Sequence, residues 1–295
     1  MSREAAFDVN GRTVLITGAA RGIGAASAER LHAKGANVAL VGLEPERLEE
    51  NAARLGERAA WFEADVTDFD ALERVVRGTV ERFGAIDVAI ANAGIAFTGS
   101  LAGSPVEQVE RTLDVNLLGV WRTNRAVIGQ ISERRGYLLN IASLAAIVHG
   151  ALLGPYAAAK AGVEALSDAL RVETSPSGAR VGCAYFGFID TDLVRASFAE
   201  PASEALRGQL PGFIRNPLPL SRAIDAIERG VERRADRVWA PRWVGAMLLA
   251  RGLVQPLVER LSQRDPAALV EGMRLAEEQA GAQDPVLGVA AKALR

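Results

Sequence analysis

Residues 13–24 read TVLITGAARGIG, and this stretch predicts the fold. Its first five residues are apolar or β-branched without alternation, a pattern typical of a strand buried on both faces of a parallel sheet. Glycines follow at Gly18, Gly22 and Gly24, and residues 25–34 continue as a helix. Because the free N–H groups at the start of such a helix suit a pyrophosphate, the stretch predicts a dinucleotide site within a βαβ unit.

Apolar runs and helical stretches alternate along most of the chain. We expect further strands at residues 37–41, 60–64, 86–91, 137–142, 179–186 and 237–240, and helices at 45–55, 69–83, 107–118, 155–173 and 221–233. This alternation predicts an α/β fold with a doubly wound parallel sheet, the Rossmann fold. We expect one domain at residues 1–240, with a substrate lid at 187–219, and a helical extension at 241–295 that packs on the same domain.

The composition is that of an ordinary globular chain, with 49% hydrophobic and 24% charged residues. The formal net charge of −2 gives no basic field for nucleic acid or an anionic membrane. The single cysteine, Cys183, lies in an apolar run and is interpreted as a core residue of a protein from a reducing compartment. No apolar stretch is long enough for a membrane span, and residues 1–10 do not resemble a signal peptide, so we expect a soluble cytoplasmic protein.

The residues expected to bind the dinucleotide follow the carboxyl ends of the strands. They are expected at the glycine turn, at the adenosine ribose, at the adenine and beside the nicotinamide. In chain order they are Gly18, Arg21, Gly22, Ile23, Gly24, Leu43, Glu44, Asp65, Val66, Asn92, Ala93, Gly94, Ile189 and Thr191. No metal site is expected.

Glu44 determines which cofactor we expect. It follows Gly24 by 20 residues, the distance at which an acid bonds the ribose hydroxyls and repels a 2′-phosphate. As an uncompensated negative charge it favours NAD, whereas Arg21 and Arg47 could pair with a 2′-phosphate and favour NADP. For Asp65, contact with the adenine amino group competes with a role as a helix cap.

Tyr156 and Lys160 are four residues apart and therefore share one face of a predicted helix. A nearby ammonium group favours the phenolate, so we expect Lys160 to lower the pKa of Tyr156 and fit it for acid/base work. The chain has only three tyrosines and three lysines, which makes this spacing informative. Ser143 follows the strand at 137–142, and Asn116 interrupts a helix. The alternative is a half-buried structural tyrosine beside a solvated lysine.

Taken together, these residues resemble the classical short-chain dehydrogenase/reductase family over residues 10–240. The resemblance implies a cofactor turn at 17–24 and a catalytic tetrad of Asn116, Ser143, Tyr156 and Lys160, with Tyr156 and Lys160 also contacting the cofactor. It implies hydride transfer between a nicotinamide and a secondary alcohol or ketone. Two departures matter: Phe186 stands where the family usually has proline, and Gly42 and Leu43 occupy the usual cofactor-discriminating position.

Two other functions remain open at this point: a non-catalytic dinucleotide-binding redox regulator, and a nucleotide-sugar epimerase or dehydratase. For an enzyme, mostly apolar residues near the site suggest a lipid-like, steroid-like or terpenoid small-molecule substrate, although the same residues could simply fill the core. They are Phe97, Leu144, Ile147, His149, Leu152, Leu153 and Phe186, and among them His149 is better explained as a structural or surface histidine.

The extension carries an apolar surface at Trp243–Leu261 that needs a cover. We expect this segment to pack over the lid, together with the formation of a homodimer or homotetramer. A membrane surface ranks last, because the following segment carries Glu277 and Glu278 rather than a basic face.

Overall fold

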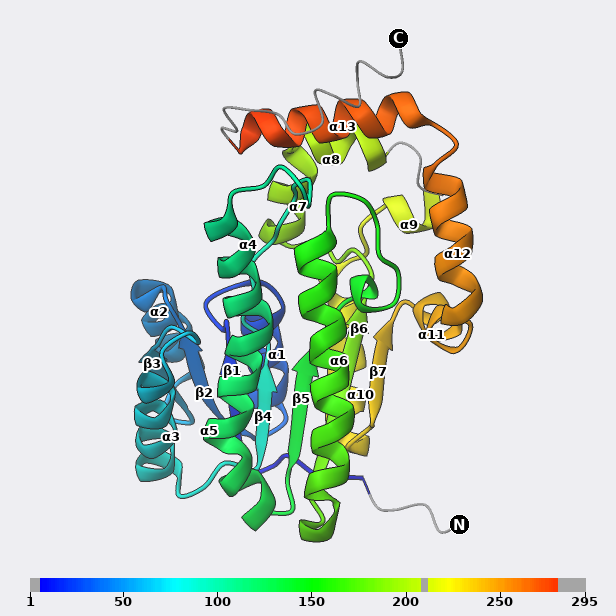
Figure 1. Cartoon of the computed structure of the whole chain (residues 1–295). Coiled ribbons are helices and arrows are strands. Elements are labelled where there is room, and N and C mark those ends of the chain that lie inside the picture. Colours follow the sequence, from blue (N-terminus) through cyan, green and yellow to red (C-terminus); the bar gives the residue numbers. More distant parts are fainter. Residues whose placement is uncertain (1–5, 208–211, 281–295) are drawn as a thin grey trace.

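The computed structural model describes residues 6–207 and 212–280, which form a seven-stranded sheet flanked by helices (Figure 1). The strand order is β3-β2-β1-β4-β5-β6-β7, and every neighbouring pair is parallel. This confirms the predicted doubly wound parallel sheet. The order reverses between β1 and β4, which is where such sheets bind their ligands. The strands are β1 (Thr13–Thr17), β2 (Asn37–Gly42), β3 (Ala59–Glu63), β4 (Val88–Ala91), β5 (Tyr137–Ile141), β6 (Arg180–Phe186) and β7 (Arg237–Ala240).

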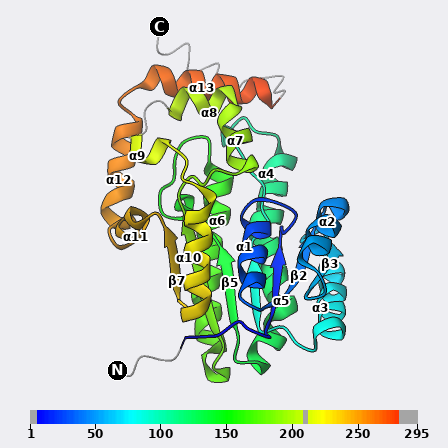
Figure 2. The ribbon, with the colours of Figure 1, turned by 180° about the vertical axis from the view of Figure 1, so that it is seen from behind.

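Helices cover both faces of the sheet, so strand residues are buried whichever way they point. On one face α1 (Gly22–Ala33), α2 (Pro45–Leu55) and α10 (Leu220–Arg233) enclose a core with alternate residues of β1 and β2 (Figure 2). On the other face lie α3 (Phe69–Phe83), α5 (Gly119–Glu133) and α6 (Gly154–Thr174). Cys183 is fully buried in this second core, as its apolar setting predicts.

Ion pairs join α1 to α10, although the two helices are far apart in the sequence. Arg30 contacts Asp225 at 3.0 Å and also pairs with Glu228, and Lys34 contacts Glu232 at 2.6 Å. Apolar residues of both helices meet beneath these pairs. The first helix of the chain therefore packs against α10, a helix near the end of the sheet-forming region.

The connection between β4 and β5 differs from the helix expected at 107–118. The structure has α4 (Val106–Leu113), a π-helical turn (Asp114–Leu118) and then α5, a helix that is not among those expected from the sequence. The wider turn contains Asn116, which lines the cleft, and it interrupts the α-helical run, which agrees with the interpretation of Asn116 as an interruption.

The segment predicted as a lid is largely helical. It contains α7 (Asp192–Ala199), α8 (Pro201–Arg207) and α9 (Gly212–Arg215). Its two ends are joined, because Asp190 N–H donates to the Leu218 carbonyl at 2.8 Å and Leu218 N–H donates to the Phe188 carbonyl at 2.9 Å. These two hydrogen bonds hold the beginning and the end of the lid segment side by side where it leaves and rejoins the rest of the domain.

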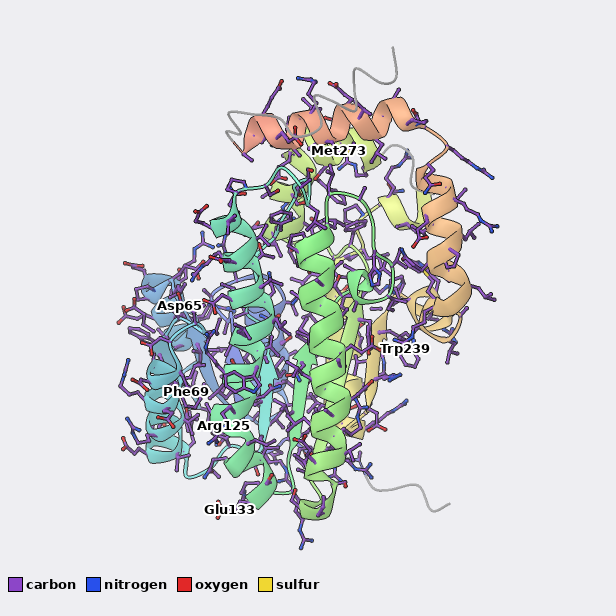
Figure 3. All side chains as sticks on the ribbon, viewed as in Figure 1. Asp65, Phe69, Arg125, Glu133, Trp239 and Met273 are labelled. Carbon is purple, nitrogen blue, oxygen red and sulfur yellow. The ribbon has the colours of Figure 1, made fainter. Side chains whose placement is uncertain are left out.

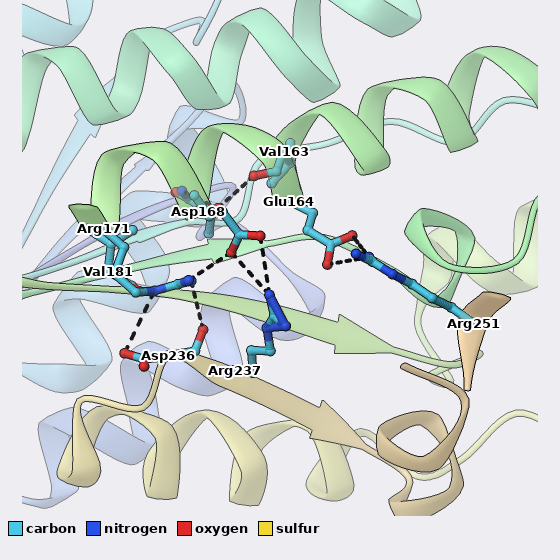
Figure 4. Close-up of polar contacts among 10 residues, drawn as sticks. Val163, Glu164, Asp168, Arg171, Val181, Asp236, Arg237 and Arg251 are labelled. Atoms are coloured by element: carbon cyan, nitrogen blue, oxygen red, sulfur yellow. Dashed lines mark hydrogen bonds and ion pairs between the residues drawn. The ribbon is translucent and has the colours of Figure 1, made fainter. Parts of the chain in front are cut away.

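The extension consists of α11 (Arg242–Leu249), α12 (Arg251–Ser262) and α13 (Pro266–Gln279), and its residues 281–295 lie outside the described part. Val244 and Leu248 of α11 enter the core beside Tyr185. Figure 4 shows how α12 is fixed at its start, where Arg251 makes two contacts with the buried carboxylate of Glu164, at 2.9 and 3.0 Å.

Residues 243–261 contact the expected lid at Trp243, whereas the exposed leucines of this segment do not cover it. Trp243 lies against Gly187 and Leu248 is buried in the core, but Leu249, Leu253, Leu257 and Leu261 face solvent. The lid is instead covered by α13, which lies along α8, with Met273 between the two helices (Figure 3). The reason is that α13 offers small residues that allow close packing on α8, whereas Arg251 holds α12 to α6.

Candidate active site

A cleft of about 470 Å³ opens at the carboxyl ends of the strands, over the switch point between β1 and β4. It is lined by all but one of the predicted site residues, the exception being Gly24. Those lining it are Gly18, Arg21, Gly22, Ile23, Leu43, Glu44, Asp65, Val66, Asn92, Ala93, Gly94, Asn116, Ser143, Tyr156, Lys160, Ile189 and Thr191.

Two positions of the turn after β1 have room only for glycine. Gly18 has φ +65°, and a Cβ there would lie 2.9 Å from the Cα of Ala93. A Cβ at Gly24 would lie 2.2 Å from the Gly18 carbonyl oxygen, so Gly24 acts through helix packing rather than by lining the cleft. Arg21 precedes α1 without a side-chain cap, which leaves the first N–H groups of the helix open toward the cleft.

Asn92 and Thr17 join the two loops that form the floor of the cleft. The Asn92 side-chain amide donates to the Thr17 carbonyl at 2.9 Å, and the Thr17 hydroxyl accepts from the backbone N–H groups of Asn92 and Ala93. Asn92 therefore positions the glycine turn, a structural role that its place after a strand did not reveal.

Glu44 is not the uncompensated charge that we expected. Its carboxylate lies 2.9 Å from the guanidinium of Arg21, and both side chains line the cleft. From the sequence, Glu44 favours NAD and Arg21 favours NADP. In the structure these two residues form one ion pair. The argument for NAD from an isolated negative charge is corrected accordingly.

Asp65 follows β3 at its carboxyl end and lines the cleft. It accepts a hydrogen bond from Thr67 N–H at 2.9 Å and contacts Arg111 at 3.1 Å. Burial alone would raise the pKa of Asp65, but the Thr67 hydrogen bonds and Arg111 outweigh this effect and lower it. The cap of α3 is Asp68, which accepts from Ala71 N–H, so helix capping does not explain Asp65.

Ser143, Tyr156 and Lys160 meet between the end of β5 and the first turns of α6. Ser143, Tyr156 and Lys160 all line the cleft, and the Ser143 hydroxyl accepts a hydrogen bond from Ala145 N–H at 3.1 Å. The Lys160 ammonium donates to the Ile141 carbonyl at 3.0 Å and lies 5.7 Å from the centre of the Tyr156 ring. Helical spacing thus brings the tyrosine and lysine to one face, as predicted.

The pKa of Tyr156 differs from the expectation. Burial raises it, and the neighbouring Ser143 hydroxyl only partly offsets that effect. Burial also lowers the pKa of Lys160, from 10.5 to about 8. The expected lowering of the Tyr156 pKa by Lys160 is wrong for this arrangement, because the ammonium is directed to a backbone carbonyl and both groups are desolvated.

Asn116 reaches the same region from the π-helical turn. Its side chain accepts from Ile95 N–H at 3.1 Å and donates to the Ile95 carbonyl at 3.0 Å. A Cβ on Gly94 would lie 2.7 Å from the Asn116 side-chain oxygen and 3.7 Å from the Lys160 ammonium. Gly94 thus lets Asn116 and Lys160 approach one backbone segment.

Most of the apolar residues expected in a substrate pocket fill the core instead. Leu144 and Ile147 pack beside Tyr185, and Leu152 packs against α8 and α13. His149 is exposed, which agrees with its interpretation as a surface residue. Of the seven expected residues, only Phe186 lines the cleft.

Several lining residues were not anticipated from the sequence. Their common feature is a place one to five residues from a predicted site residue, in the loop after β4, on α4, on the π-helical turn or on α7. They include Ile95, Val115, Leu193, Val194 and Ala196, together with Arg111 of α4.

A parallel sheet with a glycine turn at its switch point and a Ser, Tyr and Lys group beside it defines a class of dinucleotide-dependent oxidoreductases. A family model described as short chain dehydrogenase matches residues 12–202. The chain belongs to this family of oxidoreductases, as the sequence resemblance predicted. No helix in the described ranges has the length and apolar character needed to cross a membrane.

Named relatives cover most of the chain. It is 29% identical over 219 residues to a 3-oxoacyl-[acyl-carrier-protein] reductase of Vibrio cholerae, covering 74% of this chain and 90% of the relative. It is 32% identical over 213 residues to 3beta-hydroxysteroid dehydrogenase 1 of Eggerthella lenta, covering 69% and 80%. The solved structure of levodione reductase has a TM-score of 0.73 at 28% identity, covering 81% of this chain and 98% of that one.

Proposed function

We propose that the protein transfers a hydride between NAD(P) and a secondary alcohol or ketone, with Tyr156 as the acid/base. The observation that carries this proposal is that Ser143, Tyr156 and Lys160 line the same cleft as the glycine turn. The residues present fit a dinucleotide, because Gly18 and Gly24 bring backbone close together beneath an open helix N-terminus.

Each side chain has a role in this reaction. The nicotinamide, when bound, supplies or accepts the hydride. During reduction Tyr156 donates its proton to the carbonyl oxygen, and during oxidation it accepts the proton of the alcohol hydroxyl. The Ser143 hydroxyl donates a hydrogen bond to the same substrate oxygen as negative charge develops on it. Lys160 holds the ribose, and Asn116 keeps the backbone at Ile95 and Gly94 beside it.

For the cofactor, we favour NAD over NADP, on a ground different from the expected one. Arg21 is already engaged by Glu44 at 2.9 Å. A 2′-phosphate would have to displace the carboxylate before it could use Arg21, whereas ribose hydroxyls can bond Glu44 without breaking the ion pair.

The substrate class that we propose is an apolar, ring-containing alcohol or ketone. The part of the cleft beyond Tyr156 is lined by Phe186, Leu193, Val194 and Ala196. Two relatives are named for ring substrates, the 3beta-hydroxysteroid dehydrogenase above and the trans-4-hydroxycyclohexanecarboxylate dehydrogenase of Sinomonas cyclohexanicum, 33% identical over 195 residues. The family match does not favour the non-catalytic regulator.

Replacing Tyr156 by Phe tests the proposal. Because the phenol carries the transferred proton, we expect turnover of ring alcohols to fall by roughly 10²–10⁴-fold with cofactor affinity unchanged. The matched control is Tyr137→Phe, whose buried hydroxyl donates to the Ala235 carbonyl at 2.7 Å at the start of β5, the end of that strand away from the cleft. That control should lose stability and keep turnover. Wild-type turnover in Tyr156→Phe would show that the mechanism is wrong.

A further inference from the structure

A row of leucines on the extension faces solvent. Leu249 at the end of α11 is 91% exposed, and Leu253 and Leu257 of α12 are 80% and 56% exposed. Leu261 continues the row one turn later. Because Leu253, Leu257 and Leu261 are spaced four apart, they lie on one side of α12. Exposed apolar rows of this kind mark interaction surfaces.

The orientation of α12 is fixed from its other side. Arg251 pairs with the buried Glu164 of α6, and Gln255 accepts a hydrogen bond from His149 N–H at 2.9 Å. Val254 and Val258 lie on this partly buried side. Turning the leucines inward would therefore break the pairing of a buried carboxylate, so the row stays outward.

The charges around the row are positive. Although the whole chain is slightly acidic, residues 242–264 contain four arginines and one glutamate. Arg242, Arg260 and Arg264 have no ion pair among the described residues, and Glu259 is hydrogen-bonded to Gln255. The acidic residues that argued against a membrane belong to α13, where Glu277 is buried against the lid side of the molecule.

This charge pattern disfavours a second copy as the cover. In a twofold pairing of the row with itself, each copy would bring Arg260 and Arg264 to an interface whose glutamate, Glu259, is already bonded to Gln255, so the positive charges would lack partners. A surface of anionic headgroups complements the same pattern, because leucines can enter the headgroup boundary while arginines bind phosphates.

We propose that the α11–α12 face docks on a lipid surface that carries anionic headgroups, as a peripheral contact and not as a span. The proposal concerns the surface of the extension and is independent of the reaction in the cleft. Docking here would keep the protein at a surface in which apolar alcohols and ketones concentrate.

Vesicle co-sedimentation tests the proposal with the full chain. The probes are vesicles of phosphatidylcholine alone and of phosphatidylcholine with about one quarter phosphatidylglycerol. We expect the wild type to bind the anionic vesicles more tightly. Leu253→Ser and Leu257→Ser should each lower the partition constant roughly tenfold. Arg260→Gln and Arg264→Gln should each lower it roughly fivefold on anionic vesicles only.

The matched controls are exposed residues elsewhere on the molecule. Val172 of α6 is 73% exposed, and Arg125 of α5 lies well away from α12 in Figure 3. Val172→Ser and Arg125→Gln should leave vesicle binding unchanged. All variants should keep wild-type circular dichroism, because the changed side chains are exposed.

Three outcomes would overturn the proposal. The first is a wild type that binds neither vesicle. The second is a wild type whose oligomers dissociate in Leu253→Ser, measured by sedimentation, because a second copy would then cover the row. The third is vesicle binding that appears only when the chain ends at Ala280, because the row would then be covered by the chain's own last residues.

Discussion

Lys160 is a buried cation with one backbone partner, and its burial has a cost that depends on pH. It is 4% exposed and its pKa is lowered from 10.5 to about 8. Below about pH 8 the lysine is charged in both the folded and the unfolded chain, so the full penalty applies. Between about pH 8 and 10.5 the unfolded chain holds a proton that the folded chain lacks, and stability rises with pH.

We therefore predict that Lys160→Met stabilises the free protein at neutral pH while abolishing most activity. The free energy of unfolding should rise by roughly 1–3 kcal/mol at pH 7, after loss of the bond to Ile141. The gain should shrink from pH 8 to 10.5, and urea unfolding across this range measures it. The control Lys34→Met breaks surface pairs with Glu228 and Glu232 and should be destabilising. A gain independent of pH would contradict the argument.

Glu44 gives a second prediction at the scale of one residue. Glu44→Gln removes the carboxylate that engages Arg21 at 2.9 Å, so the guanidinium becomes available to a 2′-phosphate. We expect the ratio of NADP to NAD affinity to rise roughly tenfold, by fluorescence titration of both cofactors. Glu50→Gln makes the same charge change at an exposed position of α2 and should leave the ratio unchanged. An unaltered ratio in Glu44→Gln would mean that the pair does not select the cofactor.

Glycines of two helices provide a prediction about elements. Alanine is favoured over glycine inside a helix by about 1 kcal/mol where space allows. Nothing lies within 4 Å of a Cβ at Gly129 in α5, so Gly129→Ala should be slightly stabilising. At Gly24 in α1 the Cβ would lie 2.2 Å from the Gly18 carbonyl oxygen, so Gly24→Ala should destabilise by roughly 1–3 kcal/mol and weaken cofactor binding. Urea unfolding and cofactor titration of both variants test this prediction. Equal changes in the free energy of unfolding for Gly129→Ala and Gly24→Ala would refute the steric argument.

Strands were more predictable from the sequence than the helices around the site. A strand buried on both faces needs an unbroken apolar run, so each run could be recognised alone. Helix α5 was missed because the π-helical turn at Asp114–Leu118 adds a residue and shifts the apolar period between α4 and α5. The lid helices depend on contacts with α13 that no local pattern records.

The residues of the site were predictable where backbone geometry alone places them. Gly18, Ser143, Tyr156 and Lys160 follow from strand ends and helix spacing. The ion pair between Arg21 and Glu44 was not predictable, because the sequence does not show how two side chains on different loops are oriented. The pocket residues failed for another reason: Leu152 has φ +63° in the loop before α6, and this turn sends it to the lid core instead of the cleft.

On the scale of the whole molecule, we predict a homodimer or homotetramer. Trp121 of α5 is 48% exposed, and Leu118 is exposed on the same side of the sheet. Mass photometry of the pure protein should show one species of two or four chains, and Trp121→Glu should shift it toward the monomer. A monomeric wild type would refute the prediction, and the Leu253→Ser variant separates this surface from the leucine row of α12.

The pairing of α1 with α10 has a consequence for how the chain is made. Translation delivers α1 early, yet its partners Asp225, Glu228 and Glu232 leave the ribosome roughly 10–40 s later at 5–20 residues per second. Until then, Ala28 and Leu31 have no cover on that side. The apolar side of α1 that faces α10 is therefore exposed during most of synthesis, and exposed apolar surface of this kind favours association with other chains unless a chaperone covers it.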